Sequence, residues 1–114
     1  MKRLATLLFF ALALCVSAPP TRAQGADDYY KRATARFKQG DADGALADFA
    51  KAVEVDPQYT EAYASRGLIL LARHQDADAQ KDFDKYLQLN PAAKDNLAQR
   101  IKYAKYQRTK KPKT

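Results

Sequence analysis

The chain contains 114 residues, carries a formal net charge of +7 and has a single Cys. This length favours one domain and excludes two independent cores or a large multi-step enzyme. Hydrophobic residues make up 46% of the chain, which excludes a wholly disordered protein.

The N-terminal segment has the organisation of a secretory signal peptide. Lys2 and Arg3 precede an uncharged apolar run over residues 4–16. This run is shorter than the ~20 residues that a membrane-spanning helix needs. Thr21 and Ala23 are the small residues that a cleavage site requires, so we expect a signal peptide over 1–23. The predicted destination is the periplasm or the extracellular space.

Cleavage after Ala23 would remove Cys15, so the mature chain would be held together by packing without disulfides. It would keep 17 basic residues against 13 acidic ones, a net charge of +4. Cleavage after Ala18 is disfavoured because Pro19 would follow the cut. Two alternatives remain open, an uncleaved membrane anchor and a lipoprotein acylated at Cys15.

The rest of the chain repeats with a period of 34 residues. Shifting the sequence by this period places aromatic on aromatic, small on small, aliphatic on aliphatic and proline on proline, with Ala52 and Tyr86 the one mismatch in size. The aligned pairs are Tyr29 and Tyr63, Ala33 and Gly67, Ala45 and Ala79, Phe49 and Phe83, Val53 and Leu87, Val55 and Leu89, and Pro57 and Pro91.

Each repeating unit is predicted to form a helix, a tight turn and an antiparallel helix. Apolar residues recur at helical spacing on both sides of a short interruption, which falls at Gly40 in the first unit and at His74 in the second. Pro57 and Pro91 close the units, since proline lacks the backbone N–H and disfavours helix in the preceding residue. We expect a left-handed backbone at His74, because His tolerates positive φ.

These small, aromatic and proline positions resemble the tetratricopeptide repeat, with one unit over 26–59 and a second over 60–93. The resemblance implies an all-α fold of two antiparallel helical hairpins in a small exported protein of bacterial type. Arg32 and Arg66 stand where the family prefers Leu. At these positions we expect looser packing, with the aliphatic stems covering apolar surface and the charged heads in water.

After the second unit, residues 94–107 are predicted to form a capping helix. Solenoids need such a polar-backed helix because a last repeat otherwise exposes its apolar face. The remaining segment, 108–114, is expected to be a basic disordered tail. We expect the apolar helix over 61–73 to lie between the first unit and this cap.

No residue pattern supports catalysis, a cofactor or a metal site. His74 has no nucleophile or ligand cluster near it in sequence. The acidic residues of the second unit are spaced so that their side chains point in different directions on a helix, and the ligand spacing of a calcium loop is missing. These residues are Asp76, Asp78, Asp82 and Asp84. We therefore expect a protein that is not an enzyme.

The resemblance implies a concave binding face lined by the first helix of each repeat, which would hold an extended peptide or a partner helix. The positions carried over are Asp27, Tyr30, Thr34, Phe37, Lys38, Glu61, Ala64, Leu68, Leu71 and Ala72. Chaperone-binding members of the family clamp a C-terminal carboxylate with paired Lys and Asn. Lys38 alone could serve here, so that specialisation is not expected.

Charge is divided along the chain, with a net −3 over residues 24–93 and +7 over residues 94–114. For an exported chain we expect no nucleic-acid partner. One alternative function is attachment of this basic segment to anionic lipid headgroups or envelope polymers. The cations expected to make this attachment are Arg100, Lys102, Lys105, Arg108, Lys110, Lys111 and Lys113. Another alternative is self-association, because two repeats are fewer than most solenoids contain.

Overall fold

The computed structural model describes residues 18–19 and 21–110. The apolar run, Cys15 and the last four residues lie outside the described part, and so does most of the predicted signal peptide. Within the described residues, none of the helices combines the length and the apolar character that a membrane crossing requires. The elements are α1 (Arg22–Lys38), α2 (Ala42–Val55), α3 (Thr60–Ala72), α4 (Asp76–Leu89), the 3-10 turn η1 (Pro91–Ala93) and α5 (Lys94–Lys110).

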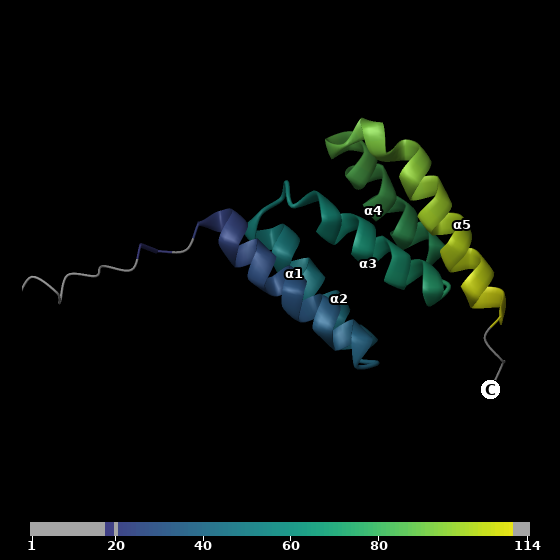
Figure 1. The fold of residues 1–114 in the computed structure, drawn as a ribbon, viewed down its shortest axis with the longest axis horizontal. Coiled ribbons are helices and arrows are strands. Elements are labelled where there is room, and N and C mark those ends of the chain that lie inside the picture. Colours follow the sequence, from purple (N-terminus) through teal and green to yellow (C-terminus); the bar gives the residue numbers. More distant parts are fainter. Residues whose placement is uncertain (1–17, 20, 111–114) are drawn as a thin grey trace, which may run out of the picture.

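The helices form two antiparallel hairpins, α1–α2 and α3–α4, with α5 packed against the second one (Figure 1). The all-α hairpin architecture predicted from the repeat is therefore confirmed. Helix α3 lies between α2 on one side and α4 and α5 on the other. This is the sandwiched position expected for the apolar helix over 61–73.

The two hairpin turns have the same backbone geometry. Gly40 has a φ of 85° and His74 a φ of 63°, so the prediction of a left-handed backbone at His74 is confirmed. After each of these residues the next backbone N–H returns to the preceding helix. Asp41 donates to the carbonyl of Arg36 and Gln75 to that of Leu70, both at 2.9 Å. These bonds satisfy carbonyls that the helix end leaves without a partner.

Small residues on the first helix of each hairpin allow the second helix to approach closely. A Cβ built on Gly67 would lie 2.6 Å from Cε1 of Phe83, a buried ring of α4. In the first hairpin, the equivalent Ala33 is fully buried in the same core cluster as Phe49. The small-and-aromatic pairing found in the sequence is thus a packing requirement between the two helices of a unit.

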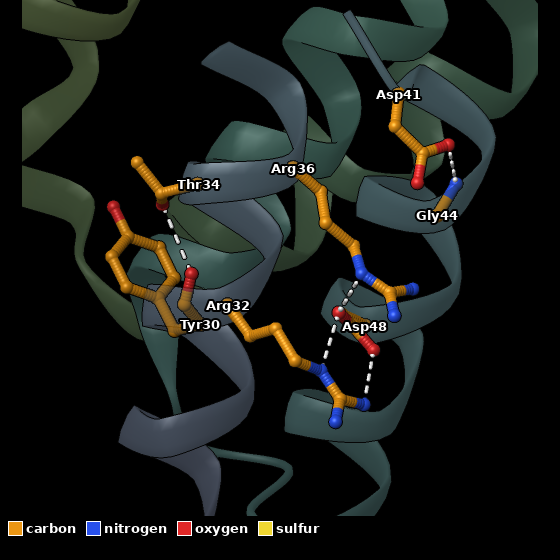
Figure 2. A network of polar contacts seen from close by, with 7 residues as sticks. All are labelled: Tyr30, Arg32, Thr34, Arg36, Asp41, Gly44 and Asp48. Carbon is orange, nitrogen blue, oxygen red and sulfur yellow. Dashed lines mark hydrogen bonds and ion pairs between the residues drawn. The ribbon is translucent and has the colours of Figure 1, made fainter. Parts of the chain in front are cut away.

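Each of the two arginines that replace Leu holds a buried carboxylate, which the expectation of charged heads in water did not include. The Arg32 side chain is still 53% exposed, whereas that of Arg66 is 24% exposed. Arg32 donates from Nε and Nη2 to the carboxylate of Asp48 at 2.8 and 2.7 Å. Arg66 holds Asp82 with the same two atoms and the same two distances. Both carboxylates are buried, so each would be without a charge partner if its arginine pointed to solvent. Figure 2 shows the first of these pairs, in which Arg36 also reaches Asp48 at 3.4 Å.

Helix α5 closes the fold as predicted but is longer than expected. Leu97 is buried in the cluster formed by α3 and α4, and Ile101 and Ala104 pack against it. The helix runs to Lys110 instead of ending at residue 107, so the first three residues assigned to a disordered tail are helical. The reason is Arg108, which donates to the carbonyl of Leu71 and holds the last turn against α3.

Candidate partner-binding groove

A groove of about 530 Å³ opens on the face formed by α1, α3 and α5. Helices α1 and α5 form its walls, and α3 forms its floor. The lining residues are Tyr30, Thr34, Phe37, Phe49, Ser65, Leu68, Ile69, Ala72, Arg100, Tyr103, Ala104, Gln107 and Arg108. The lining is mostly apolar, and its volume lies in the range of sites that bury a ligand.

Large aromatic side chains stand exposed on both walls. Phe37 of α1 is 49% exposed and Tyr103 of α5 is 65% exposed. Gln107 donates to the hydroxyl of Tyr103 at 2.7 Å, one turn further along α5. Between the walls lie Leu68 and Ala72 on the floor. This arrangement can bury the apolar side chains of a partner on three sides.

The first wall is shaped by packing within the α1–α2 hairpin. The ring of Tyr30 lies 5.5 Å from Phe49 and 5.4 Å from Tyr59, measured between ring centroids. Thr34 donates its hydroxyl to the carbonyl of Tyr30 at 3.0 Å, as Figure 2 shows. The two ring contacts fix the position of the Tyr30 side chain in the lining, and the Thr34 bond lies within α1.

Two arginines of α5 tie the other wall to the repeats. Arg100 donates to Glu61 at 3.4 Å, and Tyr86 donates its hydroxyl to the same carboxylate at 3.2 Å. Burial, and then the negative charge of Glu61, raise the pKa of Tyr86 above its usual value. This shift favours the protonated phenol, the form that donates to Glu61.

Arg108 makes the second tie with one nitrogen, Nη1. This atom donates to the Leu71 carbonyl at 2.9 Å and to Asp76 at 2.7 Å. Its side chain is 18% exposed. The contact joins the last turn of α5 to the end of α3 and the start of α4, and so holds this wall of the groove against the repeats.

Five of the ten positions predicted to form the concave face line the groove. They are Tyr30, Thr34, Phe37, Leu68 and Ala72. Lys38 is exposed but lies outside the lining.

Asp27 and Glu61 face other residues of the fold. Asp27 binds Lys31 at 2.8 Å and accepts from the Tyr59 hydroxyl at 2.7 Å. The hydrogen bond from Lys31 lowers the pKa of Asp27.

The expectation that Ala64 and Leu71 face a partner is wrong. Both are buried in the cluster that α5 covers, together with Leu97. The capping helix occupies the face of α3 that these two residues would otherwise present.

The contribution of α5 to the groove was missed, although the repeat itself contains the clue. Tyr103 lies 34 residues after Ile69, which places it at the equivalent position of a third first-helix. Extending the period by one more unit makes α5 a third first helix, but the concave positions carried over then fall on Lys102, Lys105 and Tyr106, which lie outside the lining. Ser65 and Phe49 were also missed, because neither belongs to the positions that the family resemblance supplies.

The described members of the predicted polyanion set differ in their surroundings. Arg100 and Arg108 are bound within the fold. Lys102, Lys105 and Lys110 are exposed on α5, while the remaining cations, Lys111 and Lys113, lie outside the described residues.

The four acidic residues of α4 have separate partners. Asp76 binds Arg108, Asp82 binds Arg66, and Asp84 accepts from Gln80 at 2.8 Å. Asp78 lies 3.7 Å from Lys81. Across residues 18–19 and 21–110, no group of three or more His, Cys, Asp or Glu side chains is placed to hold a metal ion.

Comparison with known proteins identifies the repeats. Residues 33–72 match the family model described as TPR repeat. The chain is 35% identical over 100 residues to tetratricopeptide repeat protein 36 of Homo sapiens, covering 83% of this chain and 50% of that protein. It is 38% identical over 64 residues to DnaJ homolog subfamily C member 3 of Rattus norvegicus, covering 56% of this chain and 13% of the relative.

A third relative is the DnaJ protein P58IPK homolog B of Oryza sativa subsp. japonica, 33% identical over 86 residues. That match covers 72% of this chain and 18% of the relative. The chain thus spans half or less of the relatives it matches.

Proposed function

Because residues 33–72 belong to the TPR repeat family, whose repeats mediate protein–protein interaction, we propose that this chain is a non-enzymatic interaction module. Its concave groove binds a peptide or a partner helix. The observation that carries this proposal is the pair of exposed aromatic side chains, Phe37 and Tyr103, on opposite walls of one apolar groove. Exposed apolar surface gathered in a concavity favours a partner that removes it from water.

We propose that this binding involves no chemistry on the partner. The polar groups of the lining are hydroxyls, one amide and two arginines, and the arginines are held by Glu61 and Asp76. The groove thus offers contact area and hydrogen bonds. Its part is to position a partner, as expected of an adaptor or scaffold.

We further propose that the chain is exported, on the basis of the basic start and the apolar run over residues 4–16. Cleavage after Ala23 would begin the mature chain at Gln24, inside the first turn of α1. It would also remove Thr21, whose hydroxyl accepts from the Gln24 N–H at 3.2 Å. Loss of such a cap costs about 1 kcal/mol of helix stability. Mass spectrometry of the protein from its host is expected to show Gln24 as the first residue, and a chain retaining Met1 would contradict export by cleavage.

A photo-activated cross-linker placed in the groove tests the binding proposal. One variant carries the cross-linking amino acid at Phe37, and a matched control carries it at Lys81, an exposed position on α4 outside the groove. After illumination in the native host, we expect a specific adduct from position 37 and none from position 81. Adducts of equal yield from both positions, or from position 81 alone, would contradict the groove as the binding surface.

The outward side of α5 supports a second candidate function, attachment to an anionic surface. Lys102, Lys105 and Lys110 are exposed there with Tyr106, and Lys110 lies over the Tyr106 ring at 5.2 Å. Binding of the protein to anionic vesicles would then fall steeply as salt is raised. Replacing the three lysines with Gln is expected to abolish it, and unchanged vesicle binding by that variant would remove this candidate.

A further inference from the structure

The charged side chains of the groove are all of one sign. Of the residues that line it, Arg100 and Arg108 are the charged ones, and no carboxylate belongs to the lining. Both arginines lie on the α5 wall. Each is paired through Nη1 with a carboxylate outside the lining, Arg100 with Glu61 and Arg108 with Asp76. A guanidinium carries five N–H donors, so its other donors can still bind a carboxylate of a partner. The Arg100 contact is also long, at 3.4 Å.

The spacing of the two arginines along α5 indicates how long a partner segment the groove can hold. They are eight residues apart on one helix, which corresponds to about 12 Å at 1.5 Å per residue. The opposite wall presents Tyr30, Thr34 and Phe37 over seven residues of α1, or about 10 Å. The groove therefore accepts roughly two turns of a partner helix along its walls.

The groove presents side chains from four helices, α1, α3 and α5 with Phe49 of α2, and no strand edge is present among the described residues. A partner in extended conformation would bring unpaired backbone N–H and C=O groups against a lining that is mostly apolar by area, and would depend on its few hydroxyl, amide and guanidinium groups to pair them. A partner helix satisfies these groups internally and needs only an apolar stripe to fill the groove.

Resting on the groove as the binding surface, we infer that its occupant is an amphipathic helix of a partner protein. The apolar stripe of this helix packs between Phe37 and Tyr103 over Leu68 and Ala72. Two carboxylates beside the stripe, seven or eight residues apart, bind Arg100 and Arg108. Opposite charge against these arginines gives the partner its orientation in the groove.

Designed peptides test this inference on the full chain. All share one apolar helical stripe; one has two Glu residues seven positions apart beside it, and a second has Gln in their place. A third peptide keeps the two Glu residues but moves them to the face opposite the stripe, so its net charge matches that of the first. Fluorescence anisotropy measures each affinity at about 50 mM and about 300 mM salt.

We expect the first peptide to bind about fivefold more tightly than the other two at low salt, with the difference shrinking at higher salt. The Tyr103→Ser variant should weaken all three peptides, whereas Tyr106→Ser, which alters an exposed residue outside the groove lining, should weaken none. Equal affinity for the Glu and Gln peptides, or for the two placements of Glu, would overturn the inference.

Other outcomes separate this inference from the proposed function. If no peptide binds but the cross-linker at position 37 captures a partner, the inferred amphipathic helix with two carboxylates is wrong as the occupant. The groove then remains a binding surface. If both experiments are negative, both proposals fail. A dimer in sedimentation that the Glu peptide does not dissociate would assign the groove to a second copy. If a synthetic peptide of residues 1–17 bound more tightly than the Glu peptide, the groove would be assigned to the chain's own N-terminal segment. Either result overturns the inference.

Discussion

Arg66 of α3 holds the buried carboxylate of Asp82 on α4 through two hydrogen bonds of 2.8 and 2.7 Å. The same pair of contacts joins Arg32 to Asp48 one repeat earlier. In each hairpin the two residues are 16 positions apart, so the period of the sequence is also the period of a polar tie between the two helices. Within each hairpin, the two helices are thus held together by an ion pair as well as by the packing of a small residue against an aromatic ring.

Removing the arginine from the second tie should destabilise the protein strongly. Arg66→Met leaves Asp82 buried without its charge partner, and we expect a loss of about 2–4 kcal/mol in the free energy of unfolding. Urea denaturation followed by circular dichroism measures it. The double variant Arg66→Met with Asp82→Leu should recover most of this loss, because no unpaired charge remains.

The first hairpin provides the matched comparison. Arg32→Met should cost less than Arg66→Met, because Arg36 also reaches Asp48 at 3.4 Å and can replace part of the lost contact. A larger loss from Arg32→Met than from Arg66→Met would contradict this account of the two ties.

The ion pair between Arg32 and Asp48 predicts that the free energy of unfolding depends on pH. The hydrogen bonds from Arg32 hold the pKa of Asp48 below its usual value of 3.8. As pH falls through 3.8, the unfolded chain takes up a proton before the native state does, so stability decreases towards the lower native pKa. Urea denaturation between about pH 6 and about pH 3 should show this decrease. In Asp48→Asn the decrease should be smaller, and an unchanged pH profile would rule out a contribution from Asp48.

Overpacking the interface between paired helices should be costly only where the position is buried. Ala79→Leu places a large side chain at a fully buried position of α4 and should cost about 1–3 kcal/mol. Ala77→Leu, on an exposed position of the same helix, should change stability by less than about 0.5 kcal/mol. Thermal denaturation of both variants checks this, and similar losses from the two would be inconsistent with the close helix approach.

The second hairpin turn should improve when its left-handed residue becomes Gly. His74 adopts a φ of 63°, and Gly reaches such angles without the steric cost of a Cβ. We expect His74→Gly to stabilise the protein by about 0.5–1 kcal/mol and Gly40→Ala, at the equivalent turn, to destabilise it by a similar amount. Chemical denaturation measures both. Destabilisation by His74→Gly would show that the imidazole contributes more than its backbone angle costs.

The repeat allowed most of the fold to be predicted, because period and packing have the same cause. Small and aromatic residues recur every 34 positions since each hairpin must pack in the same way, and the left-handed turn at His74 follows from its equivalence with Gly40. The polar ties did not follow from this reasoning. An arginine at an apolar position can turn to solvent or to a buried carboxylate, and only the folded structure shows that Asp48 and Asp82 accept from these arginines.

The groove was predicted in part, for a related reason. Its α1 wall came from the family resemblance, whereas the α5 wall depends on where the capping helix lies. That helix hides Leu71 and brings Tyr103 and Arg108 to the concave face. The length of α5 could not be predicted from local pattern, since its last turn is held by a contact between residues 37 positions apart.

The most direct test of the groove compares two tyrosines of one helix. Tyr103 and Tyr106 are 65% and 54% exposed, but only Tyr103 lines the groove. Calorimetry with the partner captured at position 37 should show that Tyr103→Ser weakens affinity at least tenfold, as expected for an aromatic contact at the centre of an interface. Tyr106→Ser should leave affinity within about twofold of the parent chain. Equal affinities for the two variants, or a loss confined to Tyr106→Ser, would contradict binding in the groove.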